Sequence, residues 1–130
     1  MPLILHIDDE QDVRDIVAQS LTPSGYEVMG AEKLVDGIHL ALKDKPDLIL
    51  LDLHMPEGNG FETCAAIRAV PGLDDIPIVF VSGMRDLKHR EQAKELGAAG
   101  FLAKPFSAED LAATVARALK TSASRRTRRS

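Results

Sequence analysis

The sequence of 130 residues contains no tryptophan, one tyrosine and one cysteine. A single cysteine excludes an intramolecular disulfide, and a reducing cytoplasm fits that composition best. No apolar run approaches the roughly 20 residues that span a bilayer. The first residues also lack the basic start of a secretory signal. We therefore expect a cytoplasmic protein of one domain, with no membrane among its partners.

The net charge of −4 is unevenly distributed along the chain. Four of the last six residues are arginines, and without them 12 basic residues face 20 acidic ones. An acidic body argues against direct nucleic-acid binding by the domain. The basic end could touch nucleic acid or lipid, but a solvated terminus is the simpler interpretation. We divide the chain into a domain at 1–120 and a basic tail or linker at 121–130.

Five short apolar runs predict five strands. They are Leu3–Ile7, Tyr26–Met29, Leu48–Leu51, Ile78–Val81 and Gly100–Ala103. Between and after them, apolar residues recur at helical spacing, most weakly over Leu87–Leu96. Alternating strands and helices with aliphatic strands indicate a parallel sheet covered by helices on both faces.

Polar residues follow four of these strands. Asp8 and Asp9 come after the first strand, Asp52 after the third, Ser82 after the fourth and Lys104 after the fifth. Right-handed crossovers bring the carboxyl ends of parallel strands to one edge of the sheet, where open α/β sheets bind ligands. We therefore expect these five side chains to meet at one site.

This combination suits a phosphoryl group. Three neighbouring carboxylates need a counter-ion, and oxygen ligands of this kind favour Mg²⁺. Lys104 and Ser82 can pair with phosphoryl oxygens, while Asp52 can attack in line as the nucleophile. Alone, each residue is more simply a helix cap or a turn residue. Four such strand ends on one edge favour the shared site.

These residues resemble the receiver domain of response regulators in two-component signalling. The matching segments are Asp8-Asp9, Leu50–Phe61, Val81-Ser82-Gly83 and Phe101–Phe106. The resemblance implies an α/β, flavodoxin-like (βα)5 fold, a doubly wound five-stranded parallel sheet with strand order 2-1-3-4-5. It also implies phosphorylation of Asp52 by a histidine kinase or phosphotransfer protein, or by small donors such as acetyl phosphate.

The resemblance also implies roles for individual residues. Mg²⁺ would be held by Asp8, Asp9, Asp52 and the backbone carbonyl of His54. The side chain of His54 either tunes the lifetime of the phosphate or is an exposed loop histidine. Both interpretations stay open.

A second set of implied roles concerns the switch. Ser82 and Lys104 would hold the phosphoryl oxygens, and Lys104–Pro105 would be a cis peptide. Phe101 would be the switch aromatic that turns inward together with Ser82. The helix Leu87–Leu96, the last strand and the last helix would form the surface that a downstream target or a phosphorylation-dependent second copy reads.

Two other functions compete with a receiver. A Mg²⁺-dependent phosphohydrolase with an aspartyl nucleophile would carry a second acid at position 54, where this chain has His54. A flavin mononucleotide carrier would have a phosphate loop rich in Ser, Thr and Gly rather than acids. We expect no enzyme activity beyond self-catalysed phosphorylation and dephosphorylation. The kinase, the target and the alternative of a domain cut from a longer protein stay open.

Overall fold

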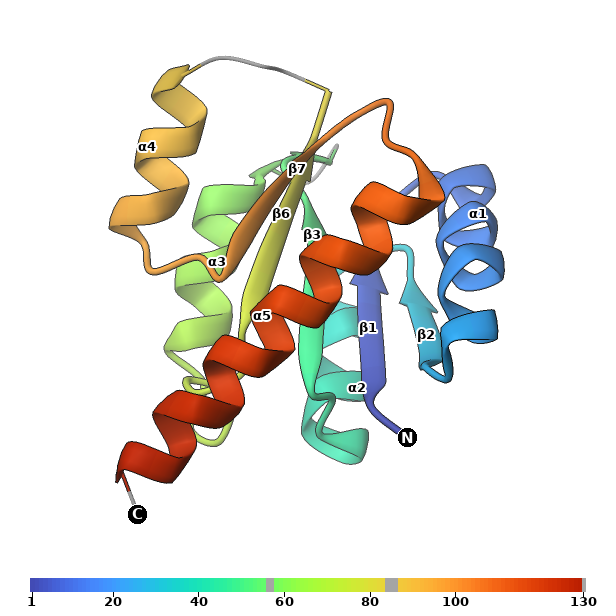
Figure 1. Ribbon diagram of the computed structural model, residues 1–130. Helices are drawn as coiled ribbons and strands as arrows, with labels where there is room; N and C mark the ends of the chain where they lie inside the picture. Colours follow the sequence, from blue (N-terminus) through green and yellow to red (C-terminus); the bar gives the residue numbers. More distant parts are fainter. Residues whose placement is uncertain (56–57, 84–86, 130) are drawn as a thin grey trace.

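The computed structural model describes residues 1–55, 58–83 and 87–129, with side chains at 54–60, 84–89 and 122–130 left undescribed. Five parallel strands form one sheet in the order β2-β1-β3-β6-β7 (Figure 1). Their bounds are β1 Leu3–Ile7, β2 Glu27–Ala31, β3 Leu48–Asp52, β6 Ile78–Ser82 and β7 Gly100–Ala103. The order matches 2-1-3-4-5 for the strands of this sheet, so the predicted flavodoxin-like fold is confirmed.

The other elements lie between these strands. The helices are α1 Gln11–Leu21, α2 Leu34–Asp44, α3 Gly60–Arg68, α4 Leu87–Glu95 and α5 Ala108–Arg129, with a 3₁₀ turn, η1, at Thr22–Ser24. A small antiparallel pair joins β4 His54–Met55 to β5 Gly58–Asn59. None of the described helices combines the length and the apolar character that crossing a bilayer requires.

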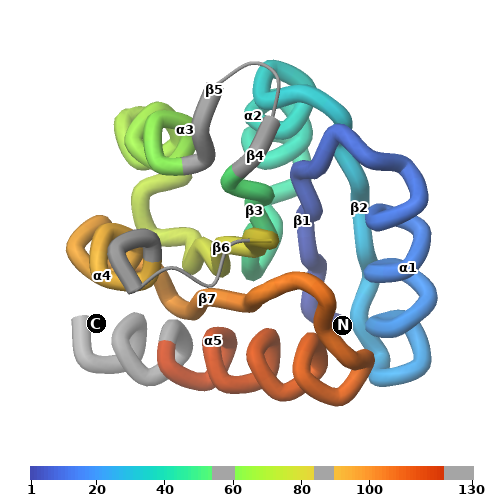
Figure 2. Tube along the Cα trace, turned by 90° about the horizontal axis from the view of Figure 1, so that it is seen from above, coloured from blue at the N-terminus to red at the C-terminus, as the bar shows by residue number. Residues whose placement is uncertain are grey.

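The sheet separates two hydrophobic cores (Figure 2). One face carries alternate strand residues such as Ile49 and Phe80, covered by α2, α3 and α4. Here Cys64 of α3 is buried, and burial raises the pKa of its thiol. The opposite face carries Ile4 and Leu50, covered by α1 and α5. Because both faces are buried, the strands read as continuous apolar runs.

Several bounds differ from the prediction by one residue, such as the ends of β3 at Asp52 and β6 at Ser82, and two differ by more. The second strand was expected at Tyr26–Met29 but runs Glu27–Ala31, since it pairs residue by residue with β1, from Leu3↔Glu27 to Ile7↔Ala31. Pairing with a neighbour, rather than apolar content, sets its length. The second difference is α5, which continues as a helix to Arg129, although apolar periodicity ends near Lys120.

A short strand pair that the sequence prediction did not include follows Asp52. β4 and β5 pair in the register His54↔Asn59 and Met55↔Gly58. Pro56 and Glu57 lie outside the described residues. β4 begins two residues after Asp52, so the β4–β5 pair follows the carboxyl end of β3.

Candidate functional site

The carboxyl ends of β1, β3, β6 and β7 carry the predicted site residues. The Asp8 N–H donates to the Ala31 carbonyl at 3.0 Å, and the Lys104 N–H donates to the Ser82 carbonyl at 2.7 Å. The first bond continues the pairing of β1 with β2 to Asp8, and the second continues the pairing of β6 with β7 to Lys104. Together they fix the backbone positions from which the side chains of Asp8 and Lys104 extend. Asp8 and Ser82 are fully buried and Asp52 is 2% exposed. Buried polar groups at strand ends need partners, which the site supplies.

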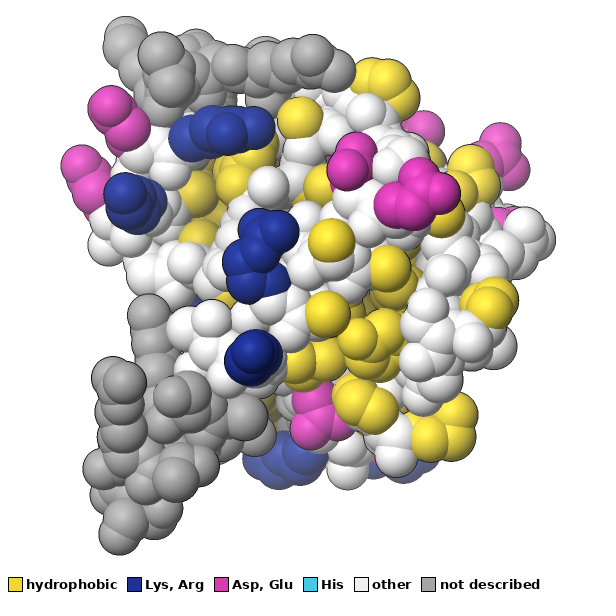
Figure 3. Space-filling view, viewed as in Figure 1, with side chains coloured by type: hydrophobic (Ala, Val, Ile, Leu, Met, Phe, Trp, Pro, Cys, Tyr) yellow, Lys and Arg dark blue, Asp and Glu magenta, His cyan; other side chains and the backbone are white. Residues whose placement is uncertain are grey.

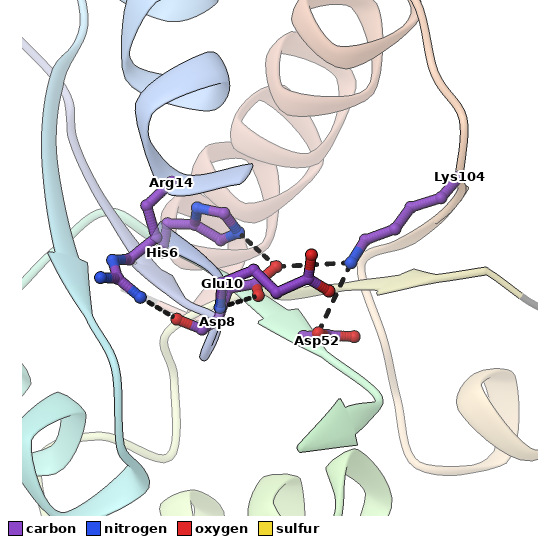
Figure 4. Close-up of polar contacts among 6 residues, drawn as sticks. All are labelled: His6, Asp8, Glu10, Arg14, Asp52 and Lys104. Atoms are coloured by element: carbon purple, nitrogen blue, oxygen red, sulfur yellow. Dashed lines mark hydrogen bonds and ion pairs between the residues drawn. The ribbon is translucent and has the colours of Figure 1, made fainter. Parts of the chain in front are cut away.

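Lys104 links the two sides of this site (Figure 4). Its Nζ lies 3.5 Å from Asp8 Oδ2 and 3.5 Å from Asp52 Oδ2. Burial alone would lower the pKa of Lys104, but the charges of Asp52 and Asp8 outweigh burial and raise the pKa above its usual value. The ammonium group therefore stays charged and is held by two carboxylates that are 96 and 52 residues away in the chain.

Asp8 is anchored by contacts to its main chain and its carboxylate. The Glu10 N–H donates to Oδ1 at 2.9 Å, and Arg14 Nη1 donates to the Asp8 carbonyl at 2.5 Å. Burial alone would raise the pKa of Asp8. The close approach of His6 and the hydrogen bond from the Glu10 N–H, together with the charge of Lys104, outweigh burial and lower the pKa. Asp8 is therefore an anion in a fixed orientation.

The acidic group at this edge includes one residue that the sequence prediction missed. Carboxylate oxygens of Asp8, Asp9 and Glu10 lie within 4.8 Å of one another. The sequence prediction grouped Asp8 and Asp9 with Asp52 and assigned Glu10 no role in the site. Its adjacency to Asp9 was the available signal. An oxygen-only donor set of this kind fits a hard cation such as Mg²⁺.

The predicted switch residues lie on β6 and β7, the two strands that follow β3 in the sheet. Ser82 ends β6, and Phe101 lies in β7, half-buried against the core on the α4 face. The Arg90 guanidinium carbon of α4 is 5.5 Å from the centre of the Phe101 ring. The Lys104–Pro105 peptide is cis, as expected. Phe101 thus connects the strand that precedes Lys104 to the neighbouring helix α4.

His54 is only partly described. Its backbone lies in β4, two residues after Asp52, whereas its side chain lies outside the described residues. The proposed role of that side chain therefore stays a prediction. A second histidine was not among the predicted site residues: His6 of β1 is fully buried beside Asp8. Asp8 follows β1 at position i+2 from His6, and that spacing places the two side chains on the same face of the sheet.

Comparison with known proteins agrees with this geometry. The family model of the response regulator receiver domain matches residues 4–116. The DNA-binding dual master transcriptional regulator RpaA of Synechocystis sp. is 36% identical over 115 residues, which cover 88% of this chain and 48% of that protein. Response regulator MprA of Mycobacterium leprae is 34% identical over 112 residues, covering 86% and 48%. The chain spans about half the length of these curated relatives.

Solved structures show the same fold. The chemotaxis response regulator CheY4 of Vibrio cholerae superposes with a TM-score of 0.85 at 32% identity, covering 91% of this chain and 98% of that one. NtrX from Brucella abortus superposes with a TM-score of 0.88 at 31% identity, covering 96% of this chain and 29% of the NtrX chain. The domain is thus similar both to a protein of its own length and to one part of a longer protein.

Proposed function

Because this chain belongs to the response regulator receiver domain family of two-component systems, we propose that it accepts a phosphoryl group on Asp52 and thereby changes which partner it binds. The observation that carries this proposal is the position of Lys104, with Nζ 3.5 Å from the carboxylates of both Asp8 and Asp52. A fixed cation between a nucleophile and an acidic group suits the transfer of a charged phosphoryl group.

Asp52, Lys104 and Ser82 have separate roles in the phosphoryl transfer. An Asp52 oxygen attacks phosphorus, forming a P–O bond while the P–N bond of a donor phosphohistidine breaks. Lys104 moves from the carboxylates to a phosphoryl oxygen, and the Ser82 hydroxyl donates a hydrogen bond to another. The donor is a histidine kinase or phosphotransfer protein in the cytoplasm. Beyond this self-catalysed transfer and the later loss of the phosphate, we expect no enzyme activity.

The acidic group fits Mg²⁺ as a cofactor. Asp8, Asp9 and Asp52, with the backbone carbonyl of His54, would hold the ion, and Glu10 adds negative charge beside them. When bound, Mg²⁺ would neutralise phosphoryl oxygens next to Asp52. The clustered carboxylates support this assignment, because like charges at such short separations are costly unless a cation offsets them.

In this proposal, the surface formed by α4, β7 and α5 is where downstream partners bind. A shallow groove there is lined by Arg90, Phe101, Asp110 and Arg117, among others. Exposed basic side chains lie on both of its helices, and Figure 3 shows such side chains on this side of the molecule. A shift of Phe101 would change this groove directly. We expect a downstream target or a second copy of the chain to bind here, with acidic groups facing the arginines.

The test compares the wild type with Asp52→Asn. Each protein is incubated with Mg²⁺ and acetyl phosphate, and its intact mass is measured. The wild type should gain one phosphoryl group and Asp52→Asn none. Asp44→Asn is the matched control, because Asp44 is an exposed carboxylate at the end of α2. It should behave as wild type.

Two outcomes would contradict the proposal. One is a mass gain that persists in Asp52→Asn. The other is a wild type that responds neither to acetyl phosphate nor to beryllofluoride nor to a histidine kinase. Repeated turnover of a simple phosphate monoester, dependent on Asp52 and Mg²⁺, would instead favour the phosphohydrolase.

A further inference from the structure

His6 is a polar residue in an apolar layer. It pairs in register with Leu50 of β3 and shares the sheet face of Ile4, which packs under α1 and α5. The side chain is fully buried, and within the described part of the chain neither ring nitrogen makes a hydrogen bond of good geometry. Burying an imidazole in this way costs free energy, and an aliphatic residue would pack there without that cost.

The imidazole of His6 faces the carboxylate of Asp8, as Figure 4 shows. His6 Nε2 lies 3.5 Å from Asp8 Oδ2, longer than a well-formed N–H···O bond of about 2.9 Å. The carboxylate favours the imidazole tautomer that carries its proton on Nε2, so this nitrogen can act as the donor. A small movement of either side chain would turn this approach into a hydrogen bond.

The Asp8 carboxylate is thus approached from three directions. Oδ1 accepts from the Glu10 N–H at 2.9 Å, while Oδ2 faces His6 and Lys104, each at 3.5 Å. Under the proposed function, Lys104 leaves Asp8 for the phosphoryl group. His6 is then the side chain that still holds Oδ2. A carboxylate oxygen can accept more than one interaction, so this contact leaves room for a cation.

We propose that His6 is a positioning residue for the cation site: its imidazole orients the Asp8 carboxylate for Mg²⁺, both before and after Lys104 moves to a phosphoryl group. This inference rests on the proposed function, because it takes Mg²⁺ as the ligand of Asp8. Partners that orient a ligating side chain commonly change metal affinity by about 10- to 100-fold when they are removed. His6 has the burial and the proximity to act in this way.

The experiment measures Mg²⁺ binding by isothermal titration calorimetry, at one pH and without any phosphodonor. His6→Leu and His6→Val remove the donor and keep an apolar side chain, and both should weaken Mg²⁺ binding by roughly tenfold. His6→Gln keeps a side-chain N–H and should lose less. Ile4→Val is the matched control, since it alters the same strand face without touching Asp8, and it should bind as wild type.

A second measurement separates positioning from core packing. Thermal unfolding in a chelator should show His6→Leu as stable as wild type or more so, because an apolar side chain replaces a poorly partnered imidazole. Reduced affinity without reduced stability supports the proposal. Wild-type affinity in both apolar variants overturns it, as does an equal loss of affinity in Ile4→Val. If the wild type binds no Mg²⁺, the metal part of the proposed function fails first, which is a separate result.

Discussion

Lys104 is the residue on which the electrostatics of this site depend. Its side chain is 23% exposed and pairs with the carboxylates of Asp8 and Asp52, which are almost fully buried. The shifts in pKa act in opposite directions, upward for Lys104 and downward for Asp8. Both groups therefore remain charged throughout the neutral range. Removing the lysine would leave two buried negative charges without their cation, which is more costly than losing the pair together.

Replacing Lys104 by Met should destabilise the metal-free protein by about 1–3 kcal/mol, the usual cost of losing a charged partner in a buried site. Added Mg²⁺ should reduce the difference, since a cation can then offset the same carboxylates. Urea unfolding in a chelator and in Mg²⁺ measures both values. An unchanged difference in Mg²⁺ would argue against a cation site at these acids.

The pKa shifts of Lys104 and Asp8 predict how the stability of the protein depends on pH. The raised pKa of Lys104 gives a stability contribution that is full below its ordinary value of 10.5 and is lost as the pH rises through the higher folded value. The lowered pKa of Asp8 gives a contribution that is present above 3.8 and is lost as the pH falls through the lower folded value. The difference between wild type and Lys104→Met should therefore stay flat between these limits.

At the scale of single elements, α2 shows how helix packing positions the site. Gly37 is buried in this helix, and a Cβ at that position would lie 2.6 Å from Ile7 Cδ1 and 2.9 Å from its Cγ1. Glycine costs about 1 kcal/mol in a helix compared with alanine. Here it allows α2 to approach β1 directly before Asp8. Close packing of this helix thus fixes the strand end that carries the first acid.

Gly37→Ala should therefore destabilise the protein by about 1 kcal/mol, because overpacking outweighs the gain in helix propensity. Ile7→Val removes the atom nearest to the added methyl group. The double variant should consequently lose less stability than the two single variants together, with a coupling of about 1 kcal/mol in urea unfolding. Additive effects would show that the helix adjusts without pressing on Ile7.

Helix α4, unlike α2, contributes few buried side chains to the core. From Arg90 to Glu95 only Ala93 is buried, and the other side chains are exposed. The expectation of a thinly apolar helix is confirmed for these residues. Its cation–π contact with Phe101 is the kind of interaction worth about 0.5–1 kcal/mol at an exposed site. A helix with so few buried contacts is easier to shift than α5, which suits an element that reports on phosphorylation.

At the scale of the whole molecule, α5 raises the question of where the domain ends. Among the side chains of α5 that the structure describes, those up to Thr121, the buried ones are Leu111, Val115 and Ala118, with Leu119 half-buried against them. The backbone remains helical to Arg129, although apolar periodicity in the sequence ends near Lys120. The chain also covers about half of RpaA and MprA but 98% of CheY4. The similarity alone is thus compatible with a single-domain protein and with a domain of a longer protein.

Ending the chain at Lys120 should leave the free energy of unfolding within about 0.5 kcal/mol of wild type, since apolar periodicity ends near Lys120 and Thr121, the one side chain described beyond it, is exposed. Phosphoryl uptake should be unchanged. Ending it at Asp110 removes the three buried residues of α5 and should prevent folding. Circular dichroism and urea unfolding test both. A loss above about 2 kcal/mol on ending at Lys120 would make residues 121–130 part of the domain.

The amino-acid sequence by itself determined the order of elements and the polar strand ends. Aliphatic runs such as Leu48–Leu51 are local signals for buried strands, and a parallel sheet brings their ends to one edge. The positions of Asp8, Asp52, Ser82 and Lys104 at strand ends were predictable for that reason. The sequence did not indicate the bounds of β2 or the pairing of β4 with β5, because both depend on a neighbouring strand.

Tertiary structure alone decided which groups act on one another. The sequence grouped three aspartates, whereas the fold places Glu10 with Asp8 and Asp9 and joins Asp52 to Asp8 through Lys104. It also buries His6 against the Asp8 carboxylate. Local patterns specify which face or end a residue occupies. Distances between side chains from different strands, and the burial that strengthens their charges, arise only when the sheet and its covering helices assemble.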